Sequence, residues 1–228
     1  TIMTSSLRSP LLEIRSNSGA AALKGGRALD PILLFKGKPM FAFGPMSETS
    51  TFAFKLGSKA YDVRRWADWQ KEHGMGYVRC YPEQGFGWVD LNAEGRLFPF
   101  KQVQPLVFDL EQFDPAYWDN FRAVGEALRG RDVVIHLQLV QVCYFKKAAP
   151  QARRWDCCYW NPANNVNEWT KNLQPDFPFP AENQAARAHW EAYLNKILDA
   201  VGDLGNVIFD LGNELNTDME WVDRTIGI

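Results

Sequence analysis

The residues best suited to chemistry stand together at the end of an apolar run. Residues 207–211 read Val, Ile, Phe, Asp and Leu, and Asn213 and Glu214 follow after one glycine. A short, largely apolar run is typical of a strand buried on both faces in a parallel sheet. Because α/β enzymes carry their chemistry where such strands end, we expect Glu214 to act as a general acid/base and Asn213 to orient a substrate hydroxyl.

Alternating patterns predict the elements that hold this strand end. Asp114-Pro115 joins a capping side chain to a proline suited to the first helical position, so a helix is expected to begin there. The expected helices are about residues 60–73, 114–128 and 190–201, and the expected strands are residues 11–15, 32–35, 40–43, 77–81, 132–140 and from about 206. This order indicates the α/β class with parallel strands.

Four segments, in order along the chain, resemble clan A glycoside hydrolases, a cellulase-like group of retaining (β/α)8 barrels. Residues 209–214 resemble the end of strand four, where the acid/base Glu follows an Asn. Residues 36–44, 76–79 and 160–165 resemble strand one, strand two and the loop after strand three. The resemblance covers roughly residues 32–225. It implies a glycosidase that hydrolyses O-glycosidic bonds in carbohydrate metabolism, with Asn213 on the sugar 2-hydroxyl.

The length departs from that family. A complete barrel needs eight βα units and about 250 residues, whereas the fourth expected strand of this chain begins near residue 206 of 228. We therefore expect half of a (β/α)8 TIM barrel, with an N-terminal arm at residues 1–30 and a half-barrel domain at 31–228. Two copies could close an eight-stranded ring, which predicts a homodimer. Alternatively, the chain is a fragment that needs a second chain.

Polar residues on the other expected strands extend the site. Arg79 stands where the family has an arginine that holds the nucleophile carboxylate, so it is expected to support the electrostatics of the site. The alternative is a buried ion pair with a nearby Glu or Asp, for which the sequence offers Glu48, Glu83 and Asp210. His136 and Gln138 alternate with apolar neighbours and should point to one face, where they could contact substrate.

The second carboxylate that glycoside hydrolysis needs is not identified. Retaining enzymes hold two carboxyl groups about 5–5.5 Å apart and inverting enzymes about 6.5–9.5 Å apart. The family nucleophile on strand seven has no counterpart here, and Glu48 and Glu83 are possible second members. A non-catalytic carbohydrate-binding or assembly protein descended from such an enzyme is therefore the alternative function.

Two connections rich in aromatic residues, at about 82–113 and 141–182, are longer than the usual βα loop. Pyranose rings stack their C–H faces on aromatic side chains, so Trp155, Trp160 and Trp169 are expected to form sugar-binding platforms. The alternative is that they form the core of the long loops.

Composition excludes several classes. The net charge of −2 and pI near 5.9 argue against a nucleic-acid partner. No apolar run approaches the roughly 20 residues of a membrane span, and the first residues show no signal-peptide pattern, so a soluble protein of open location is expected. The four cysteines are too few for a disulfide scaffold and Cys157-Cys158 lacks zinc-site spacing, so no metal or cofactor is expected.

Overall fold

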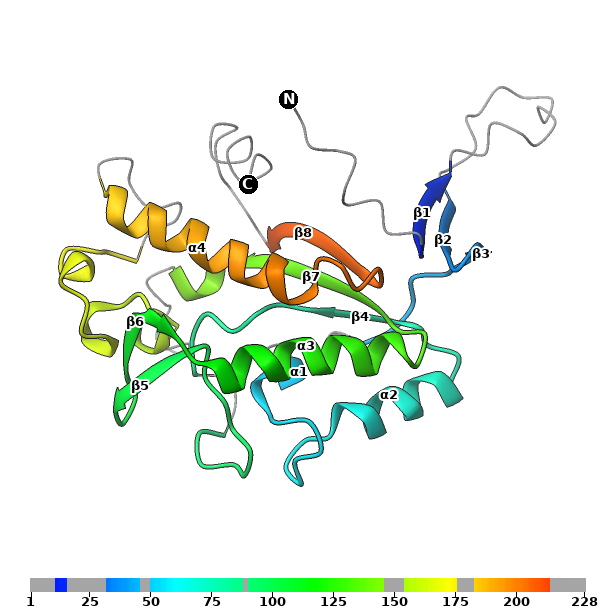
Figure 1. Ribbon diagram of the computed structural model, residues 1–228, viewed down its shortest axis with the longest axis horizontal. Coiled ribbons are helices and arrows are strands. Elements are labelled where there is room, and N and C mark those ends of the chain that lie inside the picture. The colour runs from blue at the N-terminus through cyan, green and yellow to red at the C-terminus, as the bar shows by residue number, and fades with distance from the viewer. Residues whose placement is uncertain are drawn as a thin grey trace.

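A three-stranded parallel sheet lies at the centre of the fold. The computed structural model describes residues 11–15, 32–45, 50–87, 90–145, 154–175 and 183–213. The sheet has the order β4-β7-β8, with β4 at Tyr77–Cys80, β7 at Val134–Gln141 and β8 at Val207–Asn213. The strands run in the same direction (Figure 1), so their carboxyl ends meet at one edge of the sheet.

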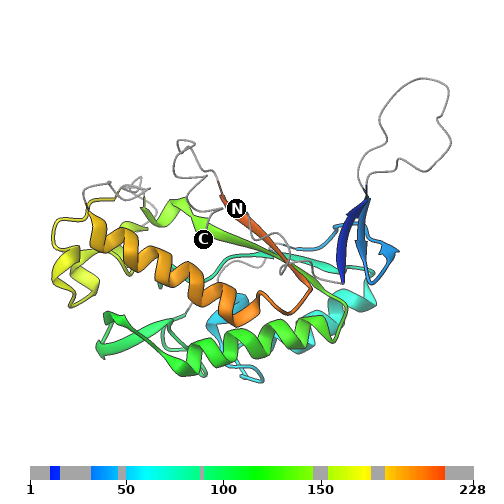
Figure 2. The ribbon, with the colours of Figure 1, turned by 45° about the horizontal axis from the view of Figure 1, so that its top comes forward.

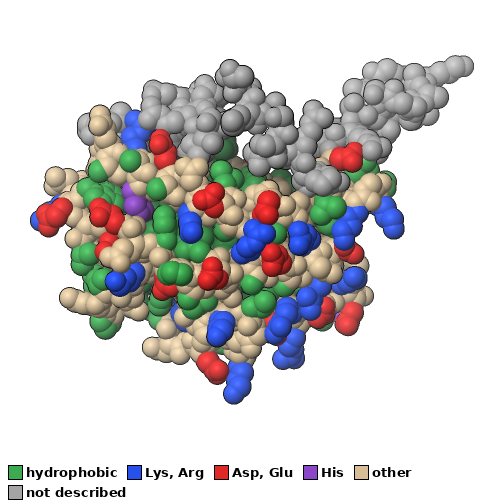
Figure 3. Space-filling view, viewed as in Figure 1, with side chains coloured by type: hydrophobic (Ala, Val, Ile, Leu, Met, Phe, Trp, Pro, Cys, Tyr) green, Lys and Arg blue, Asp and Glu red, His purple; other side chains and the backbone are tan. Residues whose placement is uncertain are grey.

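Helices cover one face of this sheet. They are α1 (Ser50–Ala53), α2 (Val63–Glu72), α3 (Pro115–Arg129) and α4 (Gln184–Val201). The three longer helices lie on the same side of the strands in both views (Figure 1, Figure 2). Acidic and basic side chains are interspersed over the helical side (Figure 3), which agrees with the near-neutral net charge.

The helix start predicted at Asp114-Pro115 is confirmed. The Asp114 carboxylate accepts a hydrogen bond of 2.9 Å from the Ala116 amide, and Pro115 is the first helical residue. The helix then presents an apolar stripe to the core, because residues three and four positions apart share a face. The members of this stripe, all fully buried, are Tyr117, Phe121, Val124 and Leu128.

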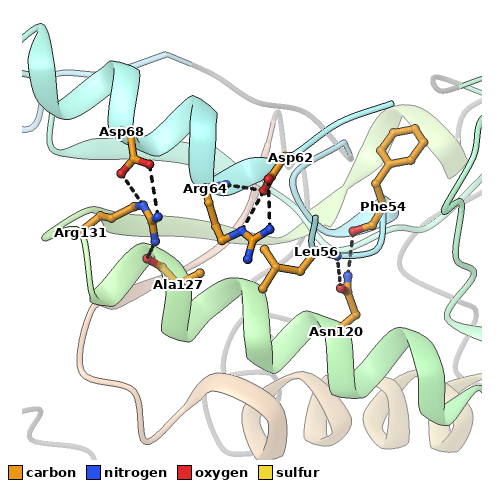
Figure 4. A network of polar contacts seen from close by, with 8 residues as sticks. All are labelled: Phe54, Leu56, Asp62, Arg64, Asp68, Asn120, Ala127 and Arg131. Carbon is orange, nitrogen blue, oxygen red and sulfur yellow. Dashed lines mark hydrogen bonds and ion pairs between the residues drawn. The ribbon is translucent and has the colours of Figure 1, made fainter. Parts of the chain in front are cut away.

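Polar contacts join α3 and the residue just after it to α2 and to the connection between α1 and α2 (Figure 4). Arg131, just after α3, binds the Asp68 carboxylate of α2 at 2.6 Å and the Ala127 carbonyl at 3.2 Å. Asn120 of α3 accepts a hydrogen bond from the Leu56 amide and donates one to the Phe54 carbonyl. The connection between α1 and α2 is therefore fixed to α3.

An antiparallel sheet of three short strands precedes α1. Its strands are β1 (Leu12–Arg15), β2 (Ile32–Phe35) and β3 (Lys38–Pro39), in sequence order. Lys36 and Gly37 form the two-residue turn between β2 and β3, and both have positive φ, at 53° and 72°. This is the left-handed geometry that matches strand twist in tight hairpins. The strand predicted within the N-terminal arm is β1, which pairs antiparallel with β2.

The long connections contain local structure. An antiparallel hairpin, β5 (Phe100–Gln104) and β6 (Val107–Phe113), lies between β4 and α3. Between β7 and α4 the described residues form four single-turn helices, which are η1 (Val142–Phe145), η2 (Trp155–Cys157), η3 (Pro162–Asn164) and η4 (Glu168–Thr170). The hairpin was not predicted from the sequence.

The prediction of a half (β/α)8 barrel is wrong. The parallel sheet of the described residues has three strands, and the two other sheets are antiparallel. Residues 40–43, predicted as the first barrel strand, form no strand, although the Arg79 amide donates to the Pro45 carbonyl at 3.3 Å. Pro39 and Pro45 bracket this segment and lack the N–H groups that a central strand must donate. A Cβ on Gly44 would meet the Tyr77 carbonyl oxygen at 1.6 Å, so the backbones touch there instead of forming a regular ladder.

A buried ion pair fixes the chain just beyond β4. Both carboxylate oxygens of Glu83 accept hydrogen bonds from the Arg96 guanidinium, and the bond from Nη1 is 2.8 Å long. The Glu83 side chain is 0% exposed and the Arg96 side chain is 3% exposed. The Tyr193 hydroxyl of α4 donates to the Glu83 carbonyl at 2.8 Å. Burial alone would lower the pKa of Arg96, but the adjacent Glu83 carboxylate outweighs burial and raises that pKa.

The next residue joins two strand ends. The side-chain nitrogen Nε2 of Gln84 donates to the Leu139 carbonyl at 2.5 Å, and the side-chain oxygen Oε1 accepts from the Gln141 backbone amide at 2.9 Å. Gln84 is itself fully buried. The chain leaving β4 is therefore held against the end of β7 by hydrogen bonds that water cannot replace without exposing the core.

We predict that Glu83→Gln destabilises the protein by about 3–5 kcal/mol, because it leaves the buried Arg96 guanidinium without a counter-ion. Urea unfolding followed by circular dichroism measures this change. Glu168→Gln is the matched control, since Glu168 and its partner Lys171 have side chains 80% and 66% exposed and such surface pairs contribute little. Equal stability of the two variants would contradict the role assigned to the pair.

Candidate functional site

The strand predicted to present the leading catalytic candidate is confirmed. β8 runs parallel to β7 and ends at Asn213, which pairs with Gln141 at the carboxyl edge of the sheet. Glu214 follows this strand end in the sequence but lies outside the described residues, as does the side chain of Asn213. Their predicted roles therefore remain predictions.

The sheet face away from the helices carries a row of polar side chains. The register pairs Arg79 with His136 and Gln138 with Asp210, and residues two positions apart on a strand share a face. Tyr77 joins the row from β4. We call these five residues the polar face. The interleaved residues on β4 and β7, such as Val78 and Leu137, are fully buried toward the helices.

His136 links a tyrosine to a carboxylate on the polar face. Its Nδ1 contacts the Tyr77 hydroxyl, and its Nε2 lies 2.9 Å from Asp210 Oδ2. Because a carboxylate only accepts, Nε2 carries the proton, and in the neutral ring Nδ1 then accepts from the Tyr77 hydroxyl. His136 and Gln138 therefore share one face, as predicted from their alternation.

Asp210 is the common acceptor of this network. Gln138 Nε2 donates to Asp210 Oδ2 at 3.0 Å, and the Gly212 amide donates to Oδ1 at 3.2 Å. Burial alone would raise the pKa of Asp210, but the hydrogen bonds from Gln138 and His136 outweigh burial and lower it. Asp210 therefore stays ionised, and its side chain remains 36% exposed.

The network leaves one buried acceptor unused. Gln138 is 2% exposed, and its side-chain oxygen has no hydrogen-bond partner among the described residues. Buried polar atoms are normally paired, so an unpaired one indicates a place where a water or ligand donates. Gln138 can thus accept from a ligand hydroxyl while its amide nitrogen holds Asp210, and His136, 22% exposed, lies beside it.

The structure narrows the alternatives for Arg79. Glu83, one of its predicted partners, is bound by Arg96, and Glu48 lies outside the described residues. Burial raises the pKa of Tyr77, and the positive charge of Arg79 acts against this increase. Arg79 therefore contributes its charge to the polar face.

The three tryptophans predicted as sugar platforms differ in exposure. Trp160 is 0% exposed, and its ring packs edge-to-face on Phe100 at 5.7 Å, so we assign it to the core. Trp155 and Trp169 are half-buried, and Trp169 Nε1 donates to Glu111 at 3.2 Å. Only Trp155 and Trp169 retain ring surface that a sugar could reach.

His189 of α4 has a structural environment. Its Nδ1 accepts from Trp160 Nε1 at 3.2 Å and its Nε2 donates to the Leu110 carbonyl at 2.6 Å. Burial lowers the pKa of His189, so the ring is held neutral. These two hydrogen bonds fix the tautomer with the proton on Nε2, and both ring nitrogens are occupied and not available for catalysis.

Metal binding finds no support in the described part of the chain, where no three His, Cys, Asp or Glu side chains are grouped. The four cysteines form no disulfide, and burial raises the pKa of the Cys80 and Cys158 thiols.

Among the described helices, none has the length and apolar character needed to cross a bilayer.

Sequence reasoning named Asp210 only as a possible partner of Arg79 and missed Tyr77. The signal for Asp210 was present, since a lone carboxylate inside an apolar strand must find buried donors. Tyr77 gave no such signal, because its role depends on the pairing of β4 with β7.

Comparison with models of known protein families gives no match, and no curated protein is significantly similar to this chain. The resemblance to clan A glycoside hydrolases therefore depends on the four short segments alone.

We predict that Gln138→Leu raises the pKa of Asp210 toward its ordinary value of 3.8, because the carboxylate loses its strongest donor. Carboxyl carbon NMR titration measures this pKa. Gln112→Leu is the matched control, since Gln112 donates to Asp109 instead. An unchanged Asp210 midpoint in Gln138→Leu would show that the network is not formed.

We predict that stability falls as the pH drops below about 6.5, because the pKa of His189 is lowered in the folded state. Its contribution is fully present above the unfolded-state pKa and is lost as the pH falls through the folded-state pKa. Urea unfolding at about pH 7.5 and about pH 5.5 tests this, and His189→Gln should reduce the difference. The exposed His73 offers the control His73→Gln, and an equal effect of both variants would exclude His189 as the cause.

Proposed function

We propose that the protein binds a carbohydrate across the polar face and hydrolyses an O-glycosidic bond with Glu214 as general acid/base. The observation that carries this proposal is the unpaired, buried side-chain oxygen of Gln138 beside the His136 and Asp210 pair. Sugars present many hydroxyl donors and acceptors, and this face offers both kinds of partner. The resemblance of residues 209–214 to the acid/base strand of glycosidases supports the same assignment.

The position of the strand end supports the chemistry. Ligands of parallel α/β sheets bind outside the carboxyl ends of the strands. β7 and β8 end together, at Gln141 and Asn213. A sugar held by Gln138 and Asp210 would therefore lie next to the strand end that Glu214 follows in the sequence.

A carbohydrate-binding protein without catalysis is the second candidate, and the environment of Glu83 favours it. Glu83 was one of two possible second carboxylates, and its complete burial against Arg96 excludes it from substrate contact. On the described polar face the only carboxylate is Asp210, which already accepts from His136 and Gln138. Binding of sugars without turnover would support this candidate.

We predict that Glu214→Gln lowers glycoside hydrolysis by about 10²–10⁴-fold, the usual contribution of a general acid/base. The measurement is release of reducing ends from a panel of oligosaccharides and release of nitrophenol from aryl glycosides. Aryl glycosides have a better leaving group and need less acid assistance, so the loss should be smaller on them.

Glu72→Gln, at the exposed end of α2, is the control and should keep wild-type activity. Hydrolysis that persists at the wild-type rate in Glu214→Gln would exclude this residue as the acid/base. Absence of hydrolysis in the wild type, together with sugar binding that Gln138→Leu weakens, would establish the non-catalytic candidate.

The homodimer expected from the sequence was argued from the open edges of a half-barrel. Because the barrel is not formed, that argument no longer applies. Dimerisation of the 26.0 kDa chain remains a prediction.

A further inference from the structure

A hollow of about 400 Å³ lies at the amino ends of the parallel strands. Gly76 and Asp132, which precede β4 and β7, line one side, and the β2-β3 hairpin with residues 40–43 lines the other. The small antiparallel sheet is seen at this end of β4 (Figure 1). We call this feature the amino-end hollow. β7 has eight residues, so about 25 Å of strand separates the hollow from the carboxyl edge.

Two exposed aromatic rings form the apolar wall of the amino-end hollow. Phe41 and Phe43 are 85% and 55% exposed, and their rings stack at 6.2 Å with an interplanar angle of 21°. The Phe43 amide donates to the Phe41 carbonyl at 2.8 Å, which holds the two rings on one side of the chain. Stacked aromatic rings left in water are typical of a surface that binds a partner.

Basic side chains surround these rings. Lys36 forms an ion pair with Asp132, and Lys71 lies 3.9 Å from the same carboxylate. Lys38 also lines the hollow and is exposed, and the described residues include no ion pair that involves it. Two ammonium groups thus share the Asp132 carboxylate and Lys38 adds a third positive charge at the hollow, so the local charge favours an anion.

The backbone is unusual at the same place. Three non-glycine residues in the described part of the chain have positive φ, and two of them, Lys36 at 53° and Asp132 at 60°, are the partners of this ion pair. Lys36 adopts this conformation because it lies in the tight β2-β3 turn, and Asp is one of the residue types enriched in it. The left-handed backbone at both positions therefore places the ion pair beside the hollow.

We propose that the amino-end hollow is an accessory binding site for an acidic sugar unit, the uronate of a polysaccharide. The C–H face of the sugar would stack on Phe41 and Phe43, and its carboxylate would pair with Lys38 and Lys36. The Asp132 carboxylate would accept hydrogen bonds from sugar hydroxyl groups. The volume lies within the usual range of ligand pockets, about 300–1,000 Å³. The proposal rests on the proposed function only in taking a carbohydrate as the ligand.

The test is calorimetric titration of trigalacturonate into the Glu214→Gln protein, in which any turnover is slowed. Phe41→Ala should weaken binding by about tenfold, because the sugar loses its apolar contact. Lys38→Gln should weaken it by about two- to fivefold, and added salt should weaken the binding that remains in Phe41→Ala. Saturation-transfer NMR should show the ring protons of the sugar against the aromatic side chains.

Matched controls are Lys59→Gln, an exposed lysine away from the hollow, and Val103→Ala, an exposed apolar residue on β5. Neither should change the affinity. The proposal is overturned if trigalacturonate does not bind, if Phe41→Ala leaves its affinity unchanged, or if neutral cellotriose binds equally well. Hydrolysis without this binding would remove the accessory site alone, whereas binding here without hydrolysis would remove only the catalytic proposal.

Discussion

The segment just past β4 is the constraint on which the rest of the described fold depends. Glu83 and Arg96 form an ion pair with almost no solvent exposure, and Gln84 holds the backbone of β7. The backbone carbonyl of Glu83 accepts a hydrogen bond from the Tyr193 hydroxyl, and the backbone carbonyl of Gln84 accepts one from the Tyr159 amide. One turn of chain therefore joins the sheet edge, the hairpin connection, α4 and the loop after β7. Desolvating two charges is unfavourable, and burial raises the pKa of Glu83 in spite of the adjacent Arg96. The hydrogen bonds of this segment offset part of that cost.

The parallel sheet separates stability from chemistry by side-chain direction. Val78 and Leu137, which face the helices, are apolar and fully buried, whereas the side chains of His136 and Asp210 on the polar face are 22% and 36% exposed. Strand alternation produces this division without any extra element. The polar residues can be ionised and wet because the opposite face supplies the apolar burial. The rigid strands then hold His136 and Asp210 at fixed separation, which loops would do less accurately.

Local signals in the sequence predicted the elements well. The Asp114-Pro115 cap and the apolar run of β8 are both short-range features, and the structure contains each of them. The number of strands in the sheet and the burial of Trp160 could not be predicted in this way, because they depend on contacts between distant segments. The fold class was inferred from a family whose short motifs recur here without its barrel. Fold and site chemistry are separable, so motif likeness alone does not fix architecture.

The buried aromatic cluster has an optical consequence. Trp160 lies 5.2 Å from Trp190 and 5.3 Å from Tyr193 between ring centroids, with the planes strongly inclined to one another. Chromophores held rigidly at such separations couple their electronic transitions and give strong near-ultraviolet circular dichroism, which disappears when fixed tertiary packing is lost. The connection after β7 and helix α4 each supply part of this cluster. The molecule thus contains an intrinsic spectroscopic reporter of whether its longest connection is docked.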